Sequence, residues 1–268
     1  MSTIITMIFK ALRLIIGVFP NKSLYFIYIK KVFEHPFSFD YFPNMRFMSS
    51  SVKSYFRYKK ILSKEPDMIG WIDSFHKNST FWDVGANVGV FTFYANYSPN
   101  VDHIYAFEPD PLNYYELTRN MILNRTNKIK SFNCGLGPND ISLFDIPYDS
   151  LSLSSGGSFR SLDFENQNKK SYGINVISFS FSGLLQLPNV KAPNYIKIDI
   201  DGLEEFILRG QENFFKQSSI REVMIEVDDT QPQTKKFIFQ FFSNCGYEQK
   251  SVNETTPNGT TFNVLFSK

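Results

Sequence analysis

The stretch Asp83-Val84-Gly85-Ala86-Asn87-Val88-Gly89 stands where a short apolar run, 80–84, gives way to helical spacing over about 88–97. Gly85 leaves the backbone free for a tight turn, and Gly89 lets the start of the helix approach the strand closely. The amides at the N-terminus of that helix can face a carboxylate or another polar group of a ligand. The stretch therefore predicts a strand, a turn and a helix arranged around a ligand site.

A carboxylate follows at a spacing that suits a nucleoside. A second apolar run, 103–107, ends at Glu108, nineteen residues after Gly89. An acid at the end of the second strand is placed to accept hydrogen bonds from two ribose hydroxyls. The alternative is a glycine turn that only connects strand to helix.

The turn differs from a dinucleotide fingerprint. G-x-G-x-x-G is absent, and an acid, Asp83, begins the motif, which suits a pyrophosphate poorly. Asp83 can meet the ammonium of an amino-acid end, directly or through one water. Because S-adenosylmethionine joins adenosine to an amino acid, we expect it as the cofactor.

Strand-like and helical stretches alternate along most of the chain. Strands are expected at 80–84, 103–107, 129–134, 195–199 and 222–227, with helical spacing between them. This alternation is typical of βαβ units and a parallel sheet. The tail, 246–250 and 260–266, predicts an antiparallel hairpin that closes the sheet. A Gly/Ser-rich insertion, 135–182, interrupts the rhythm and contains two further expected strands, 141–146 and 174–181.

Composition and charge narrow the class of protein. The 268 residues are 43% hydrophobic and 20% charged, which excludes disorder, collagen and a simple coiled coil. The net charge of +2 hides a division: residues 1–60 hold ten basic and two acidic residues, and the rest hold 18 basic and 24 acidic ones. We therefore expect a basic, aromatic-rich helical arm over 1–76 and an acidic body over 77–268. The acidic body argues against nucleic acid as a partner.

Cysteine and histidine are scarce. Two cysteines exclude a disulfide framework, and the three histidines lie in different segments, so we expect no zinc site. These counts favour a reducing compartment, and we expect a cytoplasmic protein.

The apolar opening of the chain holds two cations. Lys10 and Arg13 share one face of a helix over 4–19, which is too charged for a spanning helix and lacks the order of a secretory signal. Such a helix can lie on the inner membrane face with its basic edge towards anionic headgroups. It can equally pack on the body of the domain or on a partner subunit. The oligomeric state is not predicted.

Three stretches, 81–91, 106–109 and 196–204, together resemble the FkbM-type methyltransferases over about residues 80–230. The resemblance implies an α/β, Rossmann-like class I methyltransferase with a central, mostly parallel seven-stranded sheet, an antiparallel C-terminal hairpin strand and helices on both faces. It also implies an enzyme that transfers a methyl group from S-adenosylmethionine to a hydroxyl oxygen. In the first two of these stretches the cofactor would be bound by Asp83, Gly85, Asn87, Gly89 and Glu108. We also expect Cys134 to bind it. Asp201 departs from the family, which commonly has Glu there.

Carboxylates at the end of the 195–199 strand are the candidates for catalysis. Transfer to a hydroxyl needs a base close to the acceptor oxygen, and no histidine lies near these motifs. We assign the base to Asp199, with Asp201 and Glu204 orienting the acceptor. Lys197 alternates with Asp199 and can pair with a carboxylate on that face.

Two other interpretations of these acids stay open. Glu204 can be only a favourable charge at a helix N-terminus. Alternatively, Asp199, Asp201, Glu226 and Asp228 could together hold magnesium, although we expect no metal. The Ser/Gly stretch 155–161 is a candidate acceptor loop or a plain surface loop.

The expected acceptor is a hydroxyl of a sugar, a glycan or another small polyhydroxylated metabolite. The alternatives are a non-catalytic Rossmann-like binding protein and a nicotinamide-dependent oxidoreductase. The missing G-x-G-x-x-G argues against the oxidoreductase.

Overall fold

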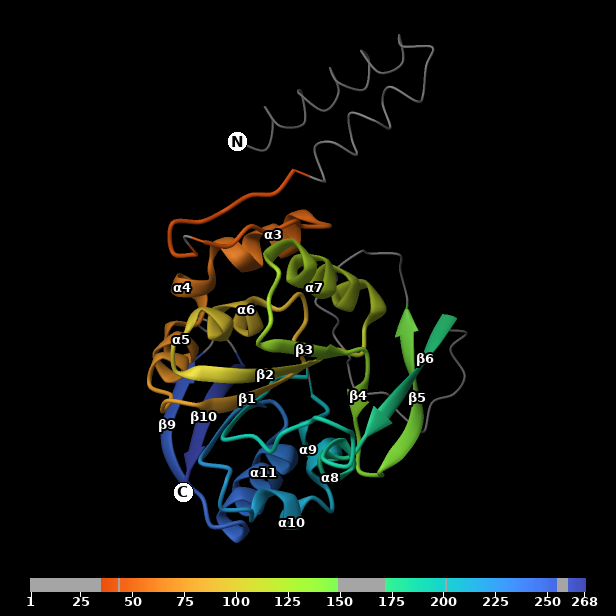
Figure 1. The fold of residues 1–268 in the computed structure, drawn as a ribbon. Helices are drawn as coiled ribbons and strands as arrows, with labels where there is room; N and C mark the ends of the chain where they lie inside the picture. The colour runs from red at the N-terminus through yellow and green to blue at the C-terminus, as the bar shows by residue number, and fades with distance from the viewer. Residues whose placement is uncertain (1–34, 43, 149–171, 201, 255–259) are drawn as a thin grey trace.

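The computed structural model describes residues 35–42, 44–148, 172–200, 202–254 and 260–268 (Figure 1). Its helices are α3 (Val52–Lys59), α4 (Ile61–Lys64), α5 (Pro66–Asp73), α6 (Val90–Tyr97), α7 (Pro111–Asn124), α8 (Phe181–Leu184), α9 (Glu204–Leu208), α10 (Glu212–Phe215) and α11 (Pro232–Asn244). Its strands are β1 (Ser79–Val84), β2 (Val101–Phe107), β3 (Ile129–Phe132), β4 (Gly135–Leu136), β5 (Ile141–Tyr148), β6 (Tyr172–Phe179), β7 (Tyr195–Ile198), β8 (Glu222–Asp228), β9 (Glu248–Glu254) and β10 (Thr261–Ser267). Three predicted features, the 4–19 helix, the 155–161 stretch and Asp201, lie outside the described residues.

Seven strands form the central sheet in the order β3-β2-β1-β7-β8-β10-β9. The first five pair in parallel, and β10 pairs antiparallel with both β8 and β9. All residues of β1 and β7 are buried, as is usual for parallel strands covered on both faces. The predicted fold class is confirmed, including the antiparallel hairpin at the C-terminal end.

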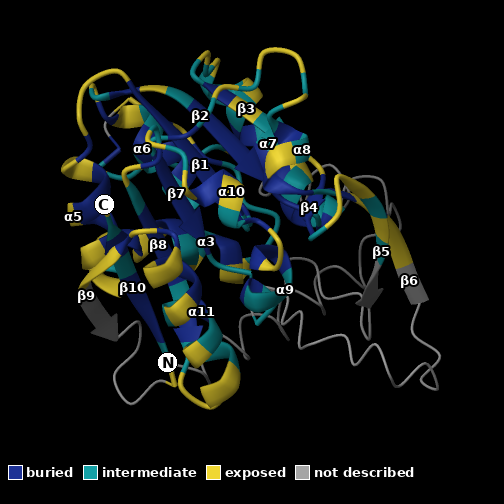
Figure 2. Cartoon of the chain, turned by 90° about the horizontal axis from the view of Figure 1, so that it is seen from below, coloured by how far each residue is buried: buried dark blue, intermediate teal, exposed yellow. Residues whose placement is uncertain are grey.

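Two helical layers cover the sheet. Helices α3–α7 lie on one face and α8–α11 on the other (Figure 1), and each layer has its own hydrophobic core. Figure 2 shows the central strands buried. In β5, the side chains of Ile141 and Leu143 are exposed. Within the described residues, no helix is long and apolar enough to cross a membrane.

The expected strands of the insertion form a hairpin beside the main sheet. β5 and β6 pair antiparallel, and β4 pairs in parallel with β6, so these three strands make a second small sheet. β4 begins at Gly135, soon after β3 ends at Phe132. It therefore connects the small sheet to the carboxyl end of β3 in the central sheet (Figure 1). The insertion thus borders the edge where a ligand of this fold class binds.

The described part of the expected arm packs onto the body. Helices α3–α5 contribute to the core under α6, where Phe47 stacks on Tyr58 and contacts Phe93 edge-on. Farther along, the ring of Phe75 stacks on Tyr195 of β7 with centroids 3.8 Å apart. Much of the aromatic content of this region is therefore core. The division of the chain at residue 76 stays a prediction.

Candidate functional site

The strand order of the central sheet has its switch point between β1 and β7. β2 and β3 extend the sheet from one side of β1, while β7 and β8 extend it from the other. In open α/β sheets, ligands bind outside the carboxyl ends of the strands at such a switch point. The turn after β1 and the turn after β7 both lie at this position.

Two glycines shape the turn after β1 because nothing larger fits. Gly85 has φ +76°, and a Cβ on it would lie 1.9 Å from the carbonyl oxygen of Asp199. Gly89 has φ +88°, and its Cβ would lie 2.3 Å from Cδ1 of Leu117. Positive φ favours glycine at both positions, and at Gly85 the backbone oxygen of Asp199 also leaves no space for a side chain. The turn after β1 can therefore approach the turn after β7 closely only because residue 85 is glycine.

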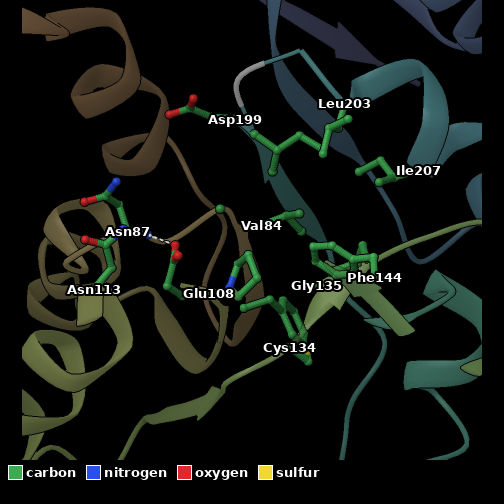
Figure 3. A pocket seen from close by; sticks show the side chains of 15 residues that line it. Val84, Asn87, Glu108, Asn113, Cys134, Gly135, Phe144, Asp199, Leu203 and Ile207 are labelled. Carbon is green, nitrogen blue, oxygen red and sulfur yellow. Dashed lines mark hydrogen bonds between the residues drawn. The ribbon is translucent and has the colours of Figure 1, made fainter. Parts of the chain in front are cut away.

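A pocket opens at this edge and contains about 580 Å³, part of it open to solvent. The residues that line it come from the ends of β1, β2 and β7, from α7 and α9, and from the small sheet: Val84, Gly85, Asn87, Phe107, Glu108, Pro109, Asn113, Cys134, Gly135, Leu136, Phe144, Asp199, Ile200, Leu203 and Ile207. Figure 3 shows the polar side chains of Asn87, Glu108 and Asn113 on one side and apolar side chains on the other.

Glu108 is the charged centre of the polar wall. Its carboxylate accepts hydrogen bonds from the backbone N–H of Asn87 at 2.6 Å and of Asp110 at 2.9 Å (Figure 3). Burial raises the pKa of Glu108 to about 7, although these two bonds favour the ionised form. The carboxylate is thus fixed in the pocket wall and titrates near neutral pH.

Asn113 is a pocket residue that sequence reasoning missed. Its side chain is almost fully buried and its amide lowers the pKa of Glu108 by hydrogen bonding, while its Oδ1 has no hydrogen-bond partner among the residues that the structure describes. A buried acceptor without a partner is costly unless a ligand supplies a donor. The available signal was its place one helical turn beyond Glu108-Pro109, near the start of α7.

The apolar wall suits a flat, weakly polar group. Cys134 lies in it beside Gly135, whose lack of a side chain gives space to the ring of Phe144: a Cβ on Gly135 would lie 2.3 Å from that ring. Burial raises the pKa of the Cys134 thiol to about 12, so this side chain is neutral. The pocket therefore has one polar wall and one apolar wall.

Three of the predicted residues form a buried ion-pair cluster beneath the pocket. Lys197 Nζ lies 3.2 Å from Asp83 Oδ1 and 3.2 Å from Asp199 Oδ2, and donates a hydrogen bond to the carbonyl of Gly85 at 3.3 Å. Thr92 donates its hydroxyl to Asp83 at 2.5 Å. Burial alone would lower the pKa of Lys197, but the carboxylates of Asp199 and Asp83 hold it above its usual value. Lys197 therefore stays charged and joins β1, β7 and the glycine turn.

The members of this cluster differ in their access to the pocket. Asp83 is fully buried and is not among the lining residues, whereas the side chain of Asp199 lines the pocket and is 31% exposed. Lys197 is buried behind Asp199. Of the three, Asp199 is the group that a substrate can reach.

Glu204 holds the turn after β7. Its Oε1 accepts hydrogen bonds from the backbone N–H of Ile200 at 3.3 Å and of Gly202 at 3.2 Å, and burial raises its pKa to about 7. It stands at the first position of α9 and is not among the pocket-lining residues. This placement agrees with the interpretation of Glu204 as a charge at the start of a helix; its orienting role stays a prediction.

Magnesium was the open alternative at the ends of β7 and β8. Across the described part of the chain, no three His, Cys, Asp or Glu side chains are grouped so that they could hold a metal ion. Asp228 accepts hydrogen bonds from the backbone and hydroxyl of Thr230 in its own loop.

Comparisons with known proteins identify the family of the domain. The profile of the Methyltransferase FkbM domain matches residues 83–248. "Methyltransferase 1" of Beauveria bassiana is 31% identical over 150 residues, which are 51% of this chain and 59% of that protein. "Hexuronic acid methyltransferase AglP" of Haloferax volcanii is 24% identical over 182 residues, covering 68% of this chain and 70% of that protein.

Solved structures give a weaker likeness. The FkbM methyltransferase of Methylobacillus flagellatus is 17% identical with a TM-score of 0.49, and the match covers 85% of this chain and 55% of that one. This chain therefore spans little more than half the length of two of its relatives, the Beauveria protein and the Methylobacillus structure.

The family profile covers well over half of the chain and includes both glycines of the turn, Glu108 and the turn after β7. The family's methyl donor is S-adenosylmethionine, the cofactor expected from the sequence. The chain belongs to the family of FkbM-domain methyltransferases.

Proposed function

We propose that the protein is an S-adenosylmethionine-dependent O-methyltransferase that acts on a hydroxyl of a sugar or another small polyhydroxylated molecule. The observation that carries the proposal is that Glu108, a group of apolar side chains and Asp199 all line the same pocket. It offers acceptors for a ribose, a slot for a base and an accessible carboxylate in one cavity.

The pocket residues divide between cofactor and acceptor. Glu108 and Asn113 would bind the ribose through its hydroxyl groups, and the wall around Cys134 and Phe144 would bind the adenine. The bound cofactor supplies an electrophilic methyl group on a sulfonium. Asp199 would accept the proton of the acceptor hydroxyl, so that the oxygen could take the methyl group that the cofactor would supply. The products are a methyl ether and S-adenosylhomocysteine.

A sugar acceptor is supported by one relative. The Haloferax volcanii protein carries the name of a hexuronic acid methyltransferase. A sugar hydroxyl is also a weak acid, so its methylation requires a positioned base such as Asp199.

Titration calorimetry with S-adenosylhomocysteine and with NAD tests the cofactor. We expect heat with the first and none with the second; the reverse result would favour the oxidoreductase, and no heat with either the non-catalytic binding protein. Incubation with S-adenosylmethionine and a panel of monosaccharides and uronic acids then tests the reaction, with methyl ethers detected by mass spectrometry. Binding without transfer to any hydroxyl acceptor in a broad panel would contradict the sugar proposal.

The affinity for S-adenosylhomocysteine is expected to rise about tenfold between pH 6 and pH 8. The ribose hydroxyls donate to the ionised form of Glu108, whose pKa is about 7, so protonation below that value removes an acceptor. Glu108→Gln should bind more weakly and lose this pH dependence. Glu204→Gln is the matched control, because Glu204 also has a pKa of about 7 but lies outside the pocket lining; it should keep the slope. Equal slopes for the wild type and Glu108→Gln would exclude Glu108 as the titrating group.

A further inference from the structure

The turn that forms the polar wall is held from outside the family domain. Tyr58, on α3, is fully buried and donates its hydroxyl to the carbonyl of Val88 at 2.6 Å. Val88 lies between Asn87, whose N–H binds Glu108, and Gly89, the N-cap of α6. Tyr58 thus fixes the peptide between Val88 and Gly89, although the family match begins at residue 83.

The same hydroxyl is tied to α7. Asn120, also fully buried, donates from Nδ2 to the Tyr58 hydroxyl at 3.0 Å and to the carbonyl of Met48 at 3.0 Å. Its Oδ1 accepts the N–H of Met48 at 2.8 Å. Asn120 therefore binds the backbone of the N-terminal segment and the tyrosine that reaches the turn.

A second contact lies one helical turn earlier on α7. Glu116 is almost fully buried, and its Oε2 accepts the N–H of Ser50 at 2.7 Å and the hydroxyl of Ser54 at 3.1 Å. Helix α7 also carries Asn113 into the pocket wall, and its N-cap Asp110 donates its N–H to Glu108. Residues 48–58 therefore contact the turn after β1 through Val88 and the middle of α7 through Glu116 and Asn120, and the first turn of the same helix carries Asn113.

We propose that residues 48–58 form a clasp that positions the cofactor turn, with Tyr58 as its positioning residue. The clasp holds Val88 and α7 at a fixed separation, and so holds the Asn87 amide against Glu108. This inference rests on the proposed function, since it takes the polar wall to be the cofactor site. Binding at the wall and order in the clasp are then coupled in both directions.

Tyr58→Phe removes the hydroxyl and keeps the ring, which stacks on Phe47 with centroids 4.6 Å apart. We expect S-adenosylhomocysteine to bind about three- to tenfold more weakly to this variant by calorimetry, using the full chain. Tyr247→Phe is the matched control. The Tyr247 hydroxyl is likewise buried and donates to a backbone carbonyl, that of Phe215 at 2.9 Å, in the core on the other face of the sheet. It should lower thermal stability and leave the affinity unchanged.

Hydrogen exchange distinguishes a local effect on the turn after β1 from a general loss of stability. Without ligand, the amide of Gly89 should exchange faster in Tyr58→Phe than in the wild type or Tyr247→Phe. With S-adenosylhomocysteine, the amides of Met48 and Ser50, which bind Asn120 and Glu116, should exchange more slowly in the wild type. That remote protection should shrink in Tyr58→Phe.

The outcomes separate the two proposals. Ligand binding by the wild type with equal affinity in Tyr58→Phe, or with no protection of Met48 and Ser50, overturns the clasp and leaves the proposed function standing. Equal loss of affinity in Tyr58→Phe and Tyr247→Phe also overturns it, because the effect would then be general. A wild type that does not bind S-adenosylhomocysteine overturns the proposed function and the clasp with it.

Discussion

Replacing Lys197 with methionine is expected to lower the free energy of unfolding by about 3–5 kcal/mol, the range for breaking a buried ion pair by removing one partner. Asp83 would remain fully buried with its Thr92 hydrogen bond and without the ammonium now 3.2 Å away. Methionine has a similar length, so the loss reflects charge more than a cavity. Urea denaturation at pH 7 measures the change.

A surface pair provides the control for Lys197. Lys235 lies 2.6 Å from Asp229, and both side chains are well exposed. Lys235→Met should cost less than about 1 kcal/mol, because exposed ion pairs contribute little. If both variants lose equally little stability, the cluster of Asp83, Lys197 and Asp199 does not support the fold in the way proposed.

Asp199→Asn is expected to lower turnover about 10²–10⁴-fold, the usual contribution of a positioned general base. The amide keeps the shape of the side chain and cannot take the acceptor's proton. Lys197 retains Asp83 as a partner in this variant, so the fold should persist. Affinity for S-adenosylhomocysteine should stay within about threefold of wild type, since the ribose-binding group is Glu108. Single-turnover methyl transfer and calorimetry on the same samples measure the two quantities.

Asp229→Asn is the matched control for charge removal at this end of the sheet. Asp229 follows β8, is exposed and does not line the pocket. Turnover should be unchanged in this variant. Wild-type turnover in Asp199→Asn would refute the assignment of the base. A parallel loss of ligand binding would show instead that Asp199 supports the cofactor site.

The sequence was sufficient for the parallel strands of the central sheet and for their order in the chain, but it did not predict β4. β1, β2, β7 and β8 lie within one residue of their predicted bounds at most ends, because apolar runs between helical patterns leave few alternatives. The helix predicted from about residue 203 differs: it is divided into α9 and α10, with Gly210 at φ +76° between them. Such a division depends on how the segment packs, which apolar spacing alone does not specify.

The site could be predicted only in part. Gly85, Glu108 and Asp199 stand at strand ends, where the sequence pattern and the fold class together place a ligand. Asn113, by contrast, is an ordinary helix residue in sequence. Its place one helical turn beyond Glu108-Pro109 was the available signal, but its burial beside Glu108 follows only from the packing of α7.

The sequence by itself determined the class of fold, the family and the edge of the sheet that holds the pocket, because these follow from local periodicity and from motifs of consecutive residues. The tertiary structure decided which acids face the pocket. Asp83 and Lys197 are 114 residues apart and meet because β1 and β7 pair in register. Tyr58 reaches Val88 in the same way, through packing of α3 onto the body. Electrostatic and hydrogen-bond partners are fixed by distance in space, so residues far apart in the chain acquire their roles only when the fold is complete.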